Sequence, residues 1–243
     1  MFFIDFLHKL SGSVFSRKSI VITVLFDIDG TLIRTGGAGM VAISQVMNEM
    51  FQVKKVAKVP VHGRTDQGIL TDLFEAHGLS FAQHREAFSQ RYWELLPATL
   101  ASGSGELLPG AKELLARLEA KPDIELGILT GNARRAAEIK LEHFGLQKFF
   151  RFGGYGDYHA SRNDVAMLAR KAAEDAVADA FDPSHLWVVG DTVNDVACGR
   201  WIDAKVIAVE TGGSDPEELR ASEPDCQLAT LRQTEDFLWA IGS

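Results

Sequence analysis

The stretch VITVLFDIDGT at residues 21–31 constrains the fold of this chain more than any other. Its first six residues are mostly β-branched, apolar or aromatic, which is typical of a central strand buried on both faces. The run ends at Asp27, and a second carboxylate, Asp29, precedes Gly30 and Thr31. Carboxylates beside a buried strand are costly unless a ligand or a reaction uses them, so Asp27 is the first candidate for chemistry. An Asp-Gly turn after an ordinary strand is the alternative interpretation.

The remainder of the chain alternates between strand and helix patterns. Further apolar runs typical of strands occupy residues 124–129, 149–152, 186–189 and 205–209. Helical patterns separate them at residues 109–119, 133–144, 163–178 and 193–202. Strands that alternate with helices are typical of a parallel sheet covered on both faces. The sequence therefore predicts the α/β class, with a doubly wound, Rossmann-like core.

A second, all-helical segment interrupts this core. Three helical patterns follow one another between two glycine-rich stretches, Gly36–Gly39 and Gly103–Gly105. We therefore expect a helical cap at residues 36–103, inserted into a core formed by residues 20–35 and 104–243. Residues 1–19 are predicted to be an N-terminal appendage, and they lack the basic front and long apolar run of a signal peptide.

The composition limits the kinds of binding partner that we expect for this protein. The chain has 243 residues and a formal net charge of −8, with no run of Lys or Arg, which argues against nucleic acid or an anionic membrane as partner. Its two cysteines do not form a disulfide framework, and no apolar run reaches the ~20 residues of a spanning helix. We therefore expect a cytoplasmic protein without a membrane partner. It is a monomer or a homodimer, and the sequence does not decide between the two.

Polar motifs end three of the predicted strands. They read DIDGT at 27–31, TGN at 130–132 and GDTVND at 190–195. Because the carboxyl ends of parallel strands open on one edge of a sheet, these motifs are expected to meet in one crevice. Crowded carboxylates repel one another, so a hard cation is their natural neutraliser. Mg²⁺ is expected, because it binds one or two carboxylates together with a substrate phosphate.

The motifs DIDGT, LTGN and GDTVND, with a basic residue before the last, resemble in order the signatures of the haloacid dehalogenase-like hydrolase superfamily. The resemblance covers about residues 20–230. The helical insert and the stretch LTGNARRAAEIKLEHFGL, followed by FGGYGDY, look like the phosphoglycolate phosphatase-like branch.

The resemblance implies a role for each carboxylate. Asp27 would be the nucleophile that forms an aspartyl-phosphate, and Asp29 the general acid that later acts as base. Asp27, Asp191 and the main-chain carbonyl of Asp29 would hold Mg²⁺. Asp195 would be a further ligand or would support the others, unless it is only a first-turn aspartate that interacts with the dipole of its helix.

The resemblance also implies phosphate-binding groups. Thr130 would bind a phosphoryl oxygen through its hydroxyl, helped by the Gly131 N–H, unless Thr130 merely ends its strand. Gly30, Thr31 and Asn132 complete the predicted substrate-binding set of the core.

One position departs from the family pattern. The family usually has a Lys before the helix that precedes the fourth motif, whereas the sequence here reads HASRNDVAML, with Arg162 in the matching place. Arg162 is therefore predicted to neutralise the phosphate, although Arg and Lys are not equivalent. Lys140 is the rival, but it is predicted to be a solvated lysine on a helix face, too far from the strand end. Arg64, in the cap motif GRTD, is predicted to meet the leaving group or a second anion, unless it is an ordinary surface arginine.

Together these features predict a Mg²⁺-dependent phosphatase acting on a small phosphorylated metabolite. A phosphomutase of the β-phosphoglucomutase kind would use the same aspartates and metal and stays an alternative, as does a catalytically idle binding protein on the same fold. Asp29 argues against a dehalogenase or a phosphonatase, because those relatives lack the second aspartate.

Overall fold

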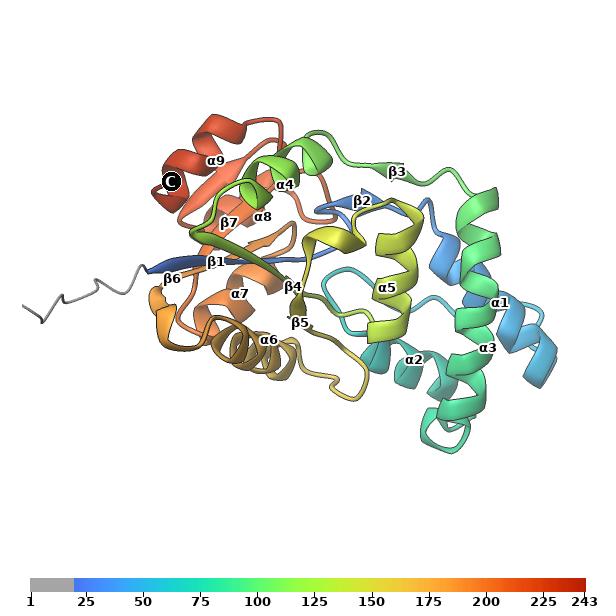
Figure 1. Ribbon diagram of the computed structural model, residues 1–243. Helices are drawn as coiled ribbons and strands as arrows, with labels where there is room; N and C mark the ends of the chain where they lie inside the picture. The colour runs from blue at the N-terminus through green and yellow to red at the C-terminus, as the bar shows by residue number, and fades with distance from the viewer. Residues whose placement is uncertain (1–19) are drawn as a thin grey trace, which may run out of the picture.

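The computed structural model describes residues 20–243, and the predicted appendage at residues 1–19 lies outside this part (Figure 1). Its centre is a parallel six-stranded sheet in the order β5-β4-β1-β6-β7-β8. The strands are β1 (Val21–Phe26), β4 (Ile124–Leu129), β5 (Phe152–Gly154), β6 (Phe181–Gly190), β7 (Lys205–Val209) and β8 (Cys226–Leu228). The prediction of a doubly wound parallel sheet is confirmed, and β1 lies between β4 and β6 in its interior.

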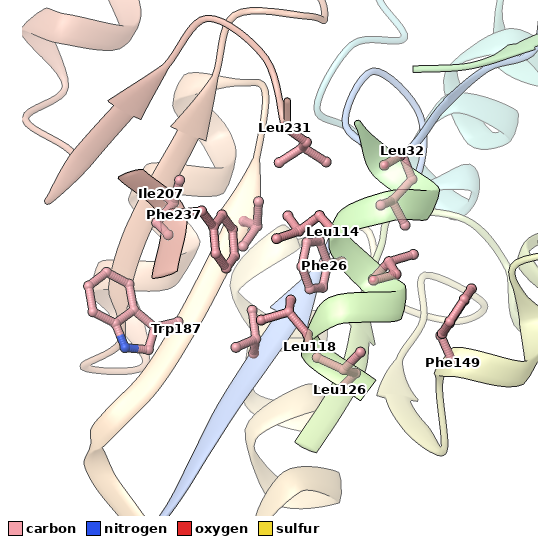
Figure 2. Close-up of a cluster of buried hydrophobic side chains, with 14 of the residues drawn as sticks. Phe26, Leu32, Leu114, Leu118, Leu126, Phe149, Trp187, Ile207, Leu231 and Phe237 are labelled. Atoms are coloured by element: carbon pink, nitrogen blue, oxygen red, sulfur yellow. The ribbon is translucent and has the colours of Figure 1, made fainter. Parts of the chain in front are cut away.

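Helices cover both faces of the sheet because successive residues of β1 point to opposite sides. Val24 and Phe26 pack with Leu114 and Phe237 on one face, whereas Leu25 belongs to the cluster on the other. Figure 2 shows Phe26 surrounded by the leucines of α4 and by Phe237, whose ring stacks on it at 6.1 Å between centroids. The helices of the core are α4 (Ala111–Glu119), α5 (Arg134–His143), α6 (Arg162–Val177), α7 (Val193–Trp201), α8 (Pro216–Ala221) and α9 (Thr234–Ile241), with 3₁₀ turns η1 (Gln147–Phe149) and η2 (Ala178–Ala180).

Three helices follow β1 before the core resumes. They are α1 (Ala38–Phe51), α2 (Asp66–Glu75) and α3 (Phe81–Ser102), and the short antiparallel strands β2 (Ile33–Arg34) and β3 (Glu106–Leu107) pair at their base. The helices have their own apolar cluster, in which Phe74 makes edge-on contacts with Phe51, Phe81 and Phe88. Helix α5 also packs into this cluster through Ala136 and Ile139. The cap boundaries at 36 and 103 stay a prediction.

None of the helices described between residues 20 and 243 is long and apolar enough to cross a membrane.

Candidate active site

The ends of β1, β4 and β6 open into a cavity of about 440 Å³ between the sheet edge and helices α1 to α3. Most of the residues predicted from the motifs line it: Asp27, Asp29, Gly30, Arg64, Thr130, Gly131, Asn132, Arg162 and Asp191. Thr31 and Asp195 lie behind this wall, because Thr31 donates to Asp191 and Asp195 pairs with Arg162. The structure therefore brings the three predicted motifs to one place, while the roles of the individual residues stay predictions.

Three buried carboxylates form the centre of the site. Asp27, Asp191 and Asp195 are 7%, 2% and 1% exposed, and one oxygen from each lies within 4.8 Å of the others. Burial raises the pKa of Asp27 to about 6, against the lowering effect of Arg162. Burial, with the charges of Asp195 and Asp27, raises the pKa of Asp191 to about 8. Three converging carboxylate oxygens are a donor set suited to a hard divalent cation such as Mg²⁺, whose charge would offset the repulsion that raises these pKa values.

Arg162 supplies positive charge from the first residue of α6. Its Nη2 lies 3.1 Å from Oδ1 of Asp27, and it also pairs with Asp195. The other oxygen of Asp195 accepts hydrogen bonds from the N–H and the hydroxyl of Thr192, at 3.0 and 2.7 Å. Asp195 thus completes the capping box of α7, whose N-cap is Thr192, and pairs with Arg162 at the same time.

Lys140 lies inside the site rather than on a solvated helix face. It is 6% exposed, and its Nζ donates to the two carboxylate oxygens of Asp29 at 2.9 and 2.7 Å. The expectation of a solvated, distant lysine is wrong, because α5 packs against the cap helices and its middle turn lies beside the strand ends. Asn132 closes the network: it accepts from Lys140 at 2.6 Å and donates to Asp29 at 2.7 Å and to Thr130 at 2.8 Å.

A glycine-rich loop after β7 holds Asp191 and was missed by the sequence analysis. The N–H of Gly213 donates to Asp191 at 2.9 Å, opposite the hydroxyl of Thr31 at 3.0 Å. A Cβ at Gly212 would lie 1.7 Å from a carboxylate oxygen of Asp191, and one at Gly30 would lie 2.4 Å away. Both glycines therefore make room for this carboxylate. The signal was the Gly-Gly pair that follows the predicted strand at 205–209.

The cap motif GRTD closes over the TGN motif of the core. The N–H of Asp66 donates to the carbonyl of Gly131 at 2.7 Å, and its carboxylate accepts from the N–H of Ala133 at 2.8 Å. A Cβ on Gly131 would lie 2.0 Å from the carbonyl oxygen of Arg64, so this contact requires glycine. The guanidinium of Arg64 is paired with Asp72 at 2.7 Å. Arg64 lines the cavity, and its predicted contact with the substrate stays a prediction.

Comparison with known proteins identifies the family of this chain. The model of the family described as haloacid dehalogenase-like hydrolase matches residues 22–203. The chain belongs to this family. The resemblance seen in the DIDGT, LTGN and GDTVND motifs is therefore confirmed.

Among curated relatives of this family member, a phosphoglycolate phosphatase of Synechococcus elongatus is 28% identical over 222 residues, which cover 90% of this chain and 96% of the relative. An N-acetylmuramic acid 6-phosphate phosphatase of Pseudomonas aeruginosa is 29% identical over 201 residues, covering 80% of this chain and 84% of that protein. These relatives support the predicted phosphoglycolate phosphatase-like branch.

Solved structures show the same fold. CbbY from Rhodobacter sphaeroides, in complex with phosphate, aligns over 87% of this chain and 95% of its own, with a TM-score of 0.66 and 18% identity. At this identity the likeness concerns the fold alone.

Proposed function

We propose that this chain is a magnesium-dependent phosphatase that hydrolyses a small phosphorylated metabolite through an aspartyl-phosphate on Asp27. The chain is a phosphoric monoester hydrolase, the class to which its curated relatives are assigned. The observation that carries the finer proposal is the placement of Asp27. Its carboxylate ends the central strand beside the Arg162 cation and two further buried carboxylates, and it faces the cavity.

In the first step of the proposed reaction, a carboxylate oxygen of Asp27 attacks phosphorus and the ester P–O bond breaks. Asp29 gives a proton to the leaving alcohol oxygen. In the second step, water attacks the aspartyl-phosphate, Asp29 takes its proton, and the phosphate leaves with Asp27 restored. Lys140 and Asn132 orient the Asp29 carboxylate for both proton transfers.

The charge of the phosphoryl group needs compensation throughout. Arg162 lies within 3.1 Å of Asp27 and is placed to offset the negative charge of the transferred group. Asp27, Asp191 and the Asp29 carbonyl would hold Mg²⁺, with Asp195 as a further ligand or as a support through Arg162. When bound, the ion supplies positive charge to the phosphoryl oxygens.

The cap at residues 36–103 is proposed to open and close over the site. The two glycine-rich stretches at its ends lie side by side, because a Cβ on Gly36 would be 2.7 Å from the hydroxyl oxygen of Ser104. Closure would exclude bulk water during transfer. Small-angle scattering with Mg²⁺ and orthovanadate is expected to show a smaller radius of gyration; an unchanged radius would contradict a moving cap.

Hydrolysis of p-nitrophenyl phosphate tests the function. The wild-type protein is expected to release p-nitrophenol with Mg²⁺, to stop in excess EDTA, and to recover when Mg²⁺ is restored. Asp27→Asn is expected to be inactive while its circular dichroism spectrum is unchanged, because the amide is a poor nucleophile. Normal turnover by this variant, or full activity in EDTA, would refute the mechanism.

A further inference from the structure

The cavity continues beyond the catalytic groups toward the cap, where its wall changes character. Its core end carries the carboxylates and cations described above. Its cap end is formed by apolar side chains of α1 and α2 and by one aromatic residue of α3. These residues are Met40, Ile43, Ile69, Leu70 and Tyr92. Because the phosphate must lie at Asp27, this apolar end receives the leaving alcohol.

No Lys or Arg of the cavity wall is unpaired among residues 20–243. Lys140 is paired with Asp29 at 2.7 Å and Arg162 with Asp27 at 3.1 Å. Toward the cap and the cavity mouth, Arg64 is paired with Asp72 at 2.7 Å, and Arg34 with Glu106 at 2.6 Å. His62, the remaining basic residue of the wall, is exposed. Apart from His62, a second anion on the substrate would meet only cations that already share their charge with a carboxylate.

One polar group does face the apolar end without a partner. Tyr92 is 4% exposed and lines the cavity, and its hydroxyl makes no hydrogen bond to any residue that the structure describes. Among the described residues, the Nε1 of the adjacent Trp93 also lacks a hydrogen-bond partner, but it is shielded from solvent. The Tyr92 hydroxyl is not shielded in this way. Gly39 of α1 lies beside this hydroxyl: a Cβ there would be 3.4 Å from the hydroxyl oxygen.

Because the Tyr92 hydroxyl opens on the cavity and has no partner among the described residues, a polar group of a bound ligand can hydrogen-bond to it. We infer that the substrate is a phosphoric monoester of an uncharged alcohol that carries further hydroxyl groups, and that Tyr92 hydrogen-bonds one of these hydroxyls. The inference rests on the proposed phosphatase function. Arg64 stays a predicted contact of the leaving group, which it would meet as one half of its ion pair with Asp72.

The substrate class is tested with a panel of probes at fixed Mg²⁺. The panel contains glycerol 3-phosphate, pentose 5-phosphates and hexose 6-phosphates as uncharged alcohols, and phosphoglycolate as the doubly anionic probe. We expect the best uncharged probe to exceed phosphoglycolate in kcat/KM by on the order of tenfold or more. An equal or higher kcat/KM for phosphoglycolate would overturn the assignment.

The role of Tyr92 is tested with Tyr92→Phe, which removes the hydroxyl and keeps the ring. The readout is kcat/KM for the best hydroxyl-bearing probe divided by kcat/KM for p-nitrophenyl phosphate, whose leaving group carries no further hydroxyl. This ratio is expected to fall on the order of fivefold, the effect of one lost hydrogen bond. Tyr158→Phe is the matched control, because Tyr158 is 75% exposed and outside the cavity, and it should keep the wild-type ratio.

A second variant, Gly39→Ala, places a methyl group 3.4 Å from the Tyr92 hydroxyl oxygen, where it competes with a ligand group, and is expected to lower the same ratio. An unchanged ratio in Tyr92→Phe would overturn the role of Tyr92. Failure of the wild-type protein to hydrolyse p-nitrophenyl phosphate with Mg²⁺ is a different result, which refutes the phosphatase proposal on which the inference rests.

Discussion

Replacing Lys140 by Met tests whether the buried lysine serves the reaction. The variant keeps the length and the packing of the side chain but removes three hydrogen bonds, two to Asp29 at 2.9 and 2.7 Å and one to Asn132 at 2.6 Å. Breaking a fully buried ion pair costs about 3–5 kcal/mol. The side chain of Asp29 is 37% exposed, so water offsets much of this loss. We expect the free energy of unfolding to fall by about 1–2 kcal/mol.

The effect on catalysis should be larger than the effect on stability. Without Lys140, Asp29 loses the cation that orients it, and the phosphoryl group loses a nearby positive charge. We expect kcat for p-nitrophenyl phosphate to fall on the order of 10²-fold, as for the removal of one positioned hydrogen-bond donor in other enzymes. Stability is measured by urea unfolding and kcat by steady-state kinetics.

Lys171→Met is the matched control, because Lys171 is 65% exposed and pairs with Asp175 at the surface. It should leave both quantities unchanged within error. If Lys140→Met instead turns over at the wild-type rate while remaining folded, the contact with Asp29 has no part in the reaction, and the argument from burial and distance fails.

Three further outcomes are expected. Arg162→Ala should lower kcat on the order of 10³-fold and Arg162→Lys should recover part of it; near-normal turnover by the alanine variant would exclude the assigned role. Gly131→Ala should cost about 1–3 kcal/mol, because its Cβ would meet the Arg64 carbonyl oxygen at 2.0 Å, and an unchanged urea midpoint would contradict this. In the folded protein the pKa of Asp27 is about 6 and that of Asp191 about 8, both above the values in the unfolded chain. The free energy of unfolding of the metal-free protein should therefore fall as pH rises from about 4 to 8. Mg²⁺ should therefore raise Tm more at pH 8 than at pH 5, and equal shifts would argue against binding at these carboxylates.

Local sequence patterns were enough to predict the parallel sheet and the convergence of its three polar motifs at one edge. The run at 21–26 is apolar and β-branched, which requires burial on both faces, and alternation of strands with helices leaves few arrangements besides a parallel sheet. Once the strands are parallel and adjacent, their carboxyl ends share an edge. Asp27, Thr130 and Asp191 then converge without any knowledge of side-chain positions.

Local sequence patterns did not predict the contacts between segments that are far apart along the chain. Lys140 was misjudged because distance along a helix says nothing about what the helix packs against, and the packing of α5 on the cap helices places that lysine beside Asp29. The position of the Tyr92 hydroxyl at the cavity has the same origin. Sequence periodicity records which face of an element is buried, whereas the partners of a buried polar group depend on how separate elements pack, and only the tertiary structure decides that.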